Sequence, residues 1–238
     1  MKANLIVTSV LSASVLFSVA SYAVAAPKAQ GLFAPGQETH AVRGPDGALP
    51  GKSRGVRVAK GLLKNKRISL NLGVGPTLEV VRKREARHGQ GTAWIGQVDG
   101  DPDSEVILTS SGQAMAGVVR HAGRMYKLVP GPGGAQSIAE VSPKSPAGHL
   151  EPVAVPDLAG DGTAVESSAA GGEINAVLDV MIVYTPASAQ RYGVDGIEAL
   201  AALAVEETNQ AYQNSQIPAR INLVHVAEVD YVESGSMN

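Results

Sequence analysis

The side chains that could do chemistry in this 238-residue chain are scattered rather than grouped. There is no cysteine, so no thiolate can attack a substrate or bind a metal ion. A hydrolytic zinc site commonly uses two histidines one helical turn apart, with a glutamate between them. The histidines are far apart in the sequence. Four are interpreted as turn or surface residues, His40, His88, His121 and His149, and His225 as a packed or edge residue of the last strand. The sequence therefore predicts no catalytic, cofactor-binding or metal-binding residue in this chain.

Several carboxylates have the spacing of the beginning of a calcium-binding loop. They are Asp99, Asp101, Asp103 and Glu105. Such a loop needs a glycine for its sharp turn and a bidentate carboxylate at its end, but Ser104 and Ser110 stand at those positions. Pro102 fits a tight hairpin turn. The pattern therefore favours a plain turn over a calcium site.

Two adjacent carboxylates, Glu206 and Glu207, have the residue type for acid–base chemistry. Neighbouring residues on a helix point to different sides, so this pair is typical of a solvated helix face. A nucleophilic serine would need a G-x-S-x-G turn, which the sequence lacks. The glycines at 89 and 91 lie between two predicted strands rather than before a helix, so they do not indicate a phosphate-binding loop.

The first 25 residues have the order of a secretory signal peptide. Met1 and Lys2 give a positive start, residues 5–20 carry no charge, and Ala23-Val24-Ala25 forms a small-x-small cleavage pattern. A single membrane anchor is the alternative, but the apolar run is short and rich in serine. We therefore predict a signal peptide over 1–25, no stable membrane anchor, and a chain secreted to the periplasm or the outside of the cell.

Charge is distributed unevenly, although the net charge is only -2. Residues 52–88 contain eleven Lys and Arg against two Glu, whereas residues 173–238 contain nine Asp and Glu against two Arg. The basic segment lacks the interleaved aromatic residues on which nucleic-acid bases stack, so no nucleic-acid partner is predicted. The opposite charges could dock the two segments on each other or could be ordinary solvated surfaces.

The middle of the chain predicts a small antiparallel all-β domain over residues 67–141. Residues 26–66 before it are rich in Gly, Pro and basic residues without a sustained period, and they predict a poorly ordered lead-in. Short alternating segments follow, separated by turn residues. The expected strands cover 67–72, 77–87, 92–98, 105–109, 115–120 and 124–129.

A linker is expected after the β-rich domain. Six prolines and eight glycines fall between residues 130 and 176, so this stretch cannot bury much apolar surface. We place the linker itself at 142–172 and the next domain at 173–238.

Residues 173–238 change character. The apolar run at 176–184 is typical of a buried central strand. Apolar residues recur at helical spacing over 197–215, with Asp195 as the expected N-cap, and 221–231 predicts a second strand. This order predicts a right-handed βαβ unit with parallel strands, and an α+β class overall. Such a unit needs more strands, so we expect the incomplete start of an α/β domain.

Four segments carry a resemblance to a known family. LDVMIVYTP at 178–186, VEETNQAYQNS at 205–215 and INLVH at 221–225 resemble the start of the catalytic domain in secreted bacterial metzincin proteases. These are reprolysin-like zinc metalloendopeptidases, and the likeness is greatest to the peptidyl-Asp metalloendopeptidases. WIGQVDGDPDS at 94–104 is similar to their β-rich propeptide. The resemblance implies a precursor with a signal peptide, a propeptide, a linker and the incomplete start of a metzincin catalytic domain.

In that family the zinc site is an H-E-x-x-H-x-x-G-x-x-H helix, and this motif does not occur here. The resemblance therefore implies peptide-bond hydrolysis by a zinc-activated water in complete members, on protein or peptide substrates. It implies no zinc ligand in this chain alone. Without a cysteine, inhibition by the propeptide would be steric or would act through a carboxylate or a histidine.

Two functions stay open from the sequence. The chain could be the precursor portion of a secreted zinc metalloendopeptidase, inactive by itself. It could instead be a free-standing exported binding or inhibitory module derived from a protease propeptide. DNA encoding H-E-x-x-H soon after the codon for Asn238 would favour the first.

Overall fold

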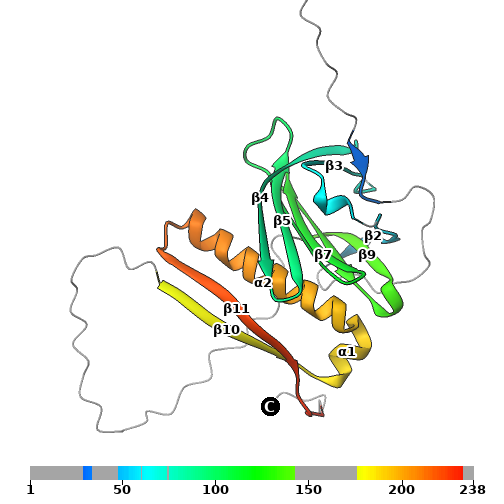
Figure 1. Cartoon of the computed structure of the whole chain (residues 1–238). Coiled ribbons are helices and arrows are strands. Elements are labelled where there is room, and N and C mark those ends of the chain that lie inside the picture. The colour runs from blue at the N-terminus through cyan, green and yellow to red at the C-terminus, as the bar shows by residue number, and fades with distance from the viewer. Residues whose placement is uncertain (1–28, 34–47, 60, 74, 143–175, 233–238) are drawn as a thin grey trace, which may run out of the picture.

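The structure is a computed structural model. It describes residues 29–33, 48–59, 61–73, 75–142 and 176–232. The predicted signal peptide at 1–25 and nearly all of the predicted linker lie outside these ranges. The described part contains two sheets and two α-helices (Figure 1), which confirms the predicted α+β class.

The larger sheet has nine strands in the order β1-β3-β4-β5-β6-β7-β8-β9-β2. All neighbours in it run antiparallel except β1 and β3. The strands are β1 (Gln30–Gly31), β2 (Ala48–Val56), β3 (Arg67–Leu70), β4 (Leu78–His88), β5 (Gly91–Val98), β6 (Glu105–Ser111), β7 (Ala114–His121), β8 (Arg124–Pro130) and β9 (Gln136–Val141). Two short 3-10 turns join them, η1 (Leu62–Lys64) and η2 (Pro132–Gly134).

The six predicted strands of the β-rich domain are all present as β3 to β8, with ends within two residues of those expected. Tight turns connect them at the predicted breakers. Gly89, Gly112 and Gly123 occupy these turns with φ of 56°, 50° and 72°. A left-handed backbone costs glycine little, which is why these positions set the register of the hairpins.

The prediction of a poorly ordered lead-in over 26–66 is wrong for the residues that the structure describes there. β2 pairs with β9, and Leu32 and Phe33 are buried in the core. Strand pairing is carried by backbone groups, which leave no apolar period in the sequence. The Pro- and Gly-rich stretch from residue 130 hides β9 for the same reason.

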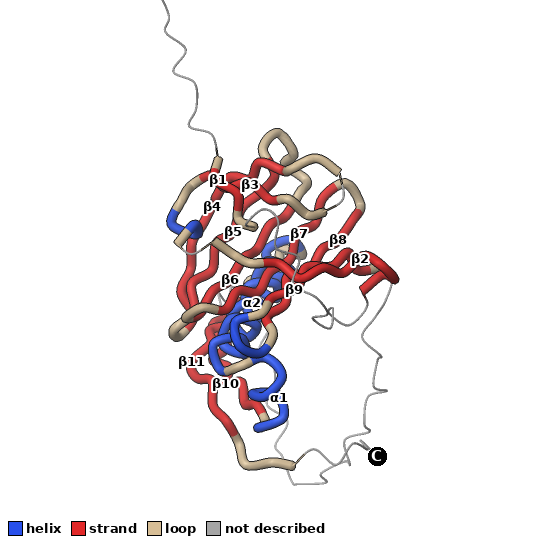
Figure 2. The backbone as a smooth tube through the Cα atoms, turned by 90° about the vertical axis from the view of Figure 1, so that its right-hand side faces the viewer, coloured by secondary structure: helices blue, strands red, loops and turns tan. Residues whose placement is uncertain are grey.

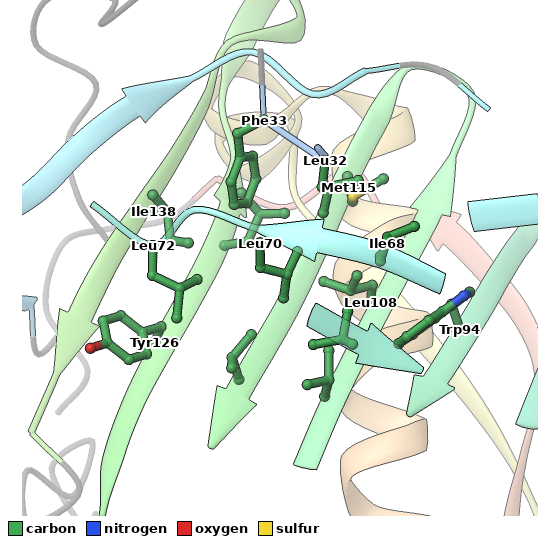
Figure 3. Packing of buried hydrophobic residues seen from close by; sticks show 14 of the residues in the cluster. Leu32, Phe33, Ile68, Leu70, Leu72, Trp94, Leu108, Met115, Tyr126 and Ile138 are labelled. Atoms are coloured by element: carbon green, nitrogen blue, oxygen red, sulfur yellow. The ribbon is translucent and has the colours of Figure 1, made fainter. Parts of the chain in front are cut away.

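One face of the larger sheet encloses the main apolar core (Figure 3). Trp94 on β5 is fully buried, and its indole Nε1 donates to the carbonyl oxygen of Asn65 at 3.0 Å. Leu108 and Leu70 pack in the same cluster, as do Leu32 and Ile68. Because alternate residues of a strand face opposite sides, Ala93 and Ile95 point to the other face of the sheet.

The smaller sheet pairs β10 (Ala176–Tyr184) with β11 (Ala219–Glu228) in parallel, as predicted. The helices α1 (Pro186–Tyr192) and α2 (Val194–Asn214) connect them. The Asn209 side chain on α2 fixes β11, since its Oδ1 accepts from the backbone N of Ile221 at 2.7 Å and its Nδ2 donates to the Ile221 carbonyl at 3.0 Å.

Two predictions about this unit are wrong. Gly193, not Asp195, is the N-cap of α2, because α1 ends directly before it. Thr185 is the N-cap of α1, and its side chain accepts from the backbone N of Ser188. β10 is not buried on both faces: Val177 and Met181 are 63% and 62% exposed. Only the face with Val180 and Ile182 is packed, against α2.

Helix α2 lies between the larger sheet and the β10–β11 pair (Figure 1 and Figure 2). Its buried residues face both sheets, which explains why its apolar stripe is wide. In the described part of the chain, no helix is long and apolar enough to cross a membrane.

Candidate functional site

The candidate site is the interface between α2 and the larger sheet. Small side chains let the helix approach closely. A Cβ added at Gly91 on β5 would lie 3.2 Å from Cβ of Ala202 on α2. Ala199 and Ala202 are fully buried, and Leu203 packs with Ile107 and Val118. The apolar contact thus joins segments about a hundred residues apart in the chain.

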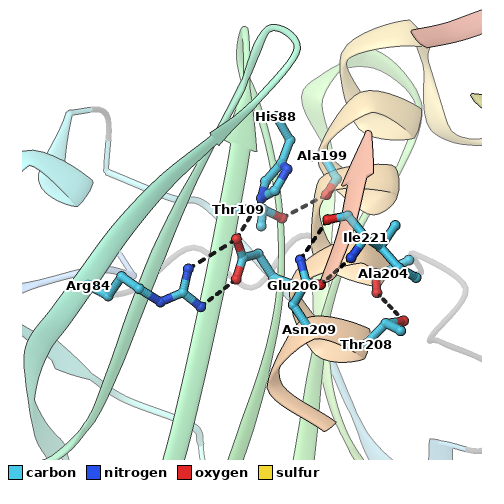
Figure 4. A network of polar contacts seen from close by, with 9 residues as sticks. All are labelled: Arg84, His88, Thr109, Ala199, Ala204, Glu206, Thr208, Asn209 and Ile221. Atoms are coloured by element: carbon cyan, nitrogen blue, oxygen red, sulfur yellow. Dashed lines mark hydrogen bonds and ion pairs between the residues drawn. The ribbon is translucent and has the colours of Figure 1, made fainter. Parts of the chain in front are cut away.

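Glu206 is the centre of a buried polar cluster in this interface (Figure 4). Its side chain is 1% exposed. Arg84 on β4 donates to both carboxylate oxygens, from Nη2 at 2.7 Å and from Nη1 at 3.3 Å. His88, also 1% exposed in its side chain, lies with Nε2 2.6 Å from Oε1 of Glu206. A carboxylate can only accept, so His88 Nε2 donates this hydrogen bond.

The electrostatics of Glu206 follow from these contacts. Burial alone would raise the pKa of this carboxyl group, because a charged group loses its hydration. The hydrogen bonds from His88 and Arg84, with the positive charge of Arg84, outweigh burial and lower the pKa to about 2. Glu206 is therefore an ionised, fully partnered carboxylate that fixes the helix to the sheet, and is not poised to exchange protons near neutral pH.

Acid should weaken this interface selectively. The pKa of Glu206 is about 2 in the folded chain against 4.5 for an ordinary glutamate. Its stabilisation is therefore complete above about pH 4.5 and is lost as the pH falls through about 2, a difference of about 3 kcal/mol. Urea unfolding of the natural chain and of Glu206→Gln across this range measures it. Equal acid sensitivity of the two proteins would contradict the assignment.

Further polar contacts extend along α2. Thr109 on β6 donates from Oγ1 to the Ala199 carbonyl oxygen at 2.7 Å, inside the apolar contact. Arg120 on β7 pairs with Glu207 at 2.7 Å and also with Glu105. These pairs are partly exposed, so each contributes little compared with the Glu206 cluster.

The first turn of α2 meets the turn between β6 and β7. The Asp195 carboxylate accepts from the backbone N of Gln113 at 3.1 Å. A Cβ added at Gly112 would lie 2.0 Å from Oδ2 of Asp195, so any larger residue here must displace the Asp195 carboxylate. The start of the helix is thereby attached to the sheet by a second, more exposed contact.

Gly112→Ala should destabilise the chain more than Gly123→Ala, by about 1 kcal/mol or more. Both glycines have positive φ, so the backbone is strained in both variants. Nothing lies within 4 Å of a Cβ at Gly123, whereas at Gly112 it meets Asp195. Denaturant midpoints of the two variants give the comparison, and equal losses would show that Asp195 contributes nothing.

The prediction that Glu206 and Glu207 form a solvated face is wrong. Both carboxylates pair with arginines of the larger sheet. In a βαβ unit alone this side of α2 would face solvent, but here the larger sheet covers it. His88 is also not a surface residue, because Glu206 binds it. The sequence contains one signal of this contact. Arg84, Ala86 and His88 are alternate residues of β4, so their side chains point to the same face of the sheet. The apolar Ala86 on that face indicates that another element covers it.

The other predicted positions behave more simply. His121 pairs through Nδ1 with Asp101 at 2.6 Å beside the turn after β5. Ser104 closes that turn, with Oγ accepting from the backbone N of Val98 at 2.8 Å and donating to the Asp101 carbonyl. The plain turn predicted for these carboxylates is what the structure contains.

His225 is exposed on β11. The remaining two, His40 and His149, lie outside the described residues.

The described residues do not fit a zinc ion. Zinc sites in proteins take three or four nitrogen, oxygen or sulfur ligands. No group of three or more His, Asp or Glu side chains in the described ranges is arranged to hold a metal ion. At Glu206 the second oxygen is occupied by Arg84, whose cationic guanidinium excludes a metal from that position. The cluster therefore holds the helix on the sheet and leaves neither oxygen of Glu206 open to a metal ion.

The chain is similar in sequence to known proteins. It is 31% identical over 140 residues to a peptidyl-Asp metalloendopeptidase of Xanthomonas campestris pv. campestris, a match that covers 57% of this chain and 33% of that protein. It is 28% identical over 183 residues to a protein of the same name from Stenotrophomonas maltophilia strain K279a, covering 68% and 43%.

A second Stenotrophomonas maltophilia protein of that name, from strain R551-3, is 29% identical over 181 residues. No protein-family model matches the chain, and no solved structure matches it. The chain spans less than half the length of the relatives it matches. Over more than half of its own length, the chain is thus similar to proteins named as metalloendopeptidases.

Proposed function

We propose that this chain is the N-terminal part of the precursor of an exported zinc metalloendopeptidase. The nine-stranded sheet is the propeptide, and the β10–α2–β11 unit begins a metzincin catalytic domain. The similarity to metalloendopeptidases supports the protease relationship. The observation that carries the proposal is the docking of α2 on the sheet through the buried Glu206 cluster.

The role of the propeptide in this proposal is to template the catalytic domain. Two parallel strands and one helix are too few to be stable alone. The larger sheet supplies the apolar surface that covers Ala199 and Leu203, and the cations that neutralise Glu206. The cations of the sheet and the carboxylates of the helix therefore attract each other, and the most buried of these carboxylates is Glu206.

The hydrolytic chemistry would come from residues that this chain does not contain. In a complete protease, zinc would polarise the scissile carbonyl of a protein or peptide substrate and activate a water molecule. The residues described here would orient the first helix and strands of the catalytic sheet. We therefore expect no proteolysis by the 238-residue chain alone. Export is part of the same proposal, with residues 1–25 removed by signal peptidase.

The genomic DNA after the codon for Asn238 gives the direct test. The longest product encoded there should contain H-E-x-x-H and should cleave a protein substrate in a reaction that a chelator stops. A variant with the motif glutamate replaced by alanine is the inactive control. Absence of the motif from all reading frames downstream, or chelator-sensitive cleavage by the 238-residue chain alone, would contradict the proposal.

A further inference from the structure

A cavity of about 700 Å³ opens on the face of the larger sheet opposite α2. Leu63 and Met115, which belong to the main core, line its apolar part. Glu85 and Arg87 on β4 line its polar part, and they alternate with the residues that face α2. Its size is typical of ligand-binding pockets.

The charge of this cavity is strongly positive. Four cationic side chains line it, Arg57, Lys64, Arg82 and Arg87, against a single carboxylate, Glu85. Arg82 is already engaged, since it pairs with Glu85 at 2.6 Å and donates to the Leu63 carbonyl oxygen at 3.2 Å. In the described ranges, the other three cations form no ion pair. Unneutralised cations around one cavity favour an anionic occupant.

Gln136 at the start of β9 adds a second requirement. This residue is 3% exposed and lines the cavity. Its Nε2 donates to the Gln113 carbonyl oxygen at 3.4 Å, which fixes the orientation of the amide. Its Oε1 is buried and accepts no hydrogen bond from any described residue. A buried acceptor without a donor is costly, so a small shift of this amide toward the cavity would let a ligand N–H group satisfy it.

We propose that this cavity binds an acidic peptide segment. Such a ligand supplies carboxylates for Arg57 and Arg87, backbone N–H groups for Gln136 Oε1, and aliphatic carbons for Leu63 and Met115. Inorganic phosphate offers charge but little donor capacity. A nucleic acid would gain from stacking, and the described lining of this cavity contains no aromatic side chain. No residue of α2 lines the cavity, although Gly112 and Gln113 at its rim also contact Asp195 at the start of that helix. This binding is proposed in addition to the propeptide role.

Binding of a short fluorescent peptide of alternating alanine and glutamate to the full chain, followed by anisotropy, tests the proposal. Arg87→Glu should weaken binding about tenfold or more, because it removes a charge-assisted contact and adds repulsion. Arg220→Glu is the matched control. It changes the net charge equally but lies exposed on β11, outside the cavity, and should leave affinity within about twofold.

Gln136→Leu tests the donor requirement separately. It should weaken peptide binding about fivefold, the effect of one hydrogen bond. A peptide with N-methylated backbone nitrogens should lose as much, with no further loss on Gln136→Leu, because both changes remove the same contact. Circular dichroism confirms that each variant stays folded. No saturable binding, equal loss in Arg87→Glu and Arg220→Glu, or preferential binding of single-stranded DNA or phosphate with the same sensitivities would overturn the proposal.

Discussion

Replacing Glu206 by glutamine should lower the free energy of unfolding at neutral pH by about 3 kcal/mol. The change keeps the shape of the side chain but removes the charge that Arg84 and His88 both contact. Glutamine keeps only one acceptor oxygen, so its NH2 group is placed against one of the N–H donors of Arg84 or His88. Arg84 is 38% exposed, so the loss comes mainly from the buried end of the cluster, where the side chains of Glu206 and His88 are each 1% exposed. Urea denaturation followed by circular dichroism measures the loss.

The neighbouring Glu207 provides the control for this prediction. Glu207→Gln makes the same chemical change one residue along the same helix. The Glu207 side chain is 28% exposed against 1% for Glu206, so water replaces much of the lost contact. The expected loss is below about 1 kcal/mol. Equal losses at the two positions would show that the Glu206 cluster has no special part in holding the helix.

Trp94→Ala should destabilise the larger sheet by about 4 kcal/mol. Trp94 is the largest fully buried side chain, and truncation would leave a cavity in the core and an unpaired carbonyl at Asn65. Trp94→Phe should cost less, about 1–2 kcal/mol, because it keeps much of the ring but loses the indole hydrogen bond. Guanidinium unfolding monitored by circular dichroism gives both values.

Val177→Ala is the matched control for these core variants. Val177 is 63% exposed on the outer face of β10, so its truncation should change stability by less than about 0.5 kcal/mol. If Trp94→Ala lowered the free energy of unfolding no more than Val177→Ala, the core shown in Figure 3 would not stabilise the chain.

Much of the β-rich domain could be predicted because its strands and turns are local features. Alternation along β4 and β5 and the glycines at 89, 112 and 123 are visible in the sequence, and they place the hairpins within two residues. The parallel β10–β11 pair follows from the order of strand, helix and strand in the same way. The edge strand β2 and its neighbour β9 could not be found, since backbone pairing sets them and leaves no side-chain pattern.

The candidate site could not be predicted from helix periodicity alone. Glu206 and Arg84 are 122 residues apart, and nothing near Glu206 in the sequence names its partner. A helix with carboxylates off its main stripe looks solvated until a second sheet covers that side. The charge difference between residues 52–88 and 173–238 pointed to such a contact in general terms, but it could not choose between docking and two independent surfaces.

The measurement that tests the docked helix most directly is disulfide formation in the double variant Gly91→Cys with Ala202→Cys. The natural chain has no cysteine, so any intramolecular disulfide reports this contact alone. The two Cβ positions are 3.2 Å apart, and a shift of a few tenths of an ångström brings them into disulfide range. Ala204 is exposed on the other side of α2, so Gly91→Cys with Ala204→Cys is the control. We predict rapid crosslinking of the monomer in the first variant and none in the second. No crosslink in the first, or equal crosslinking in both, would contradict the docking of α2 on the sheet.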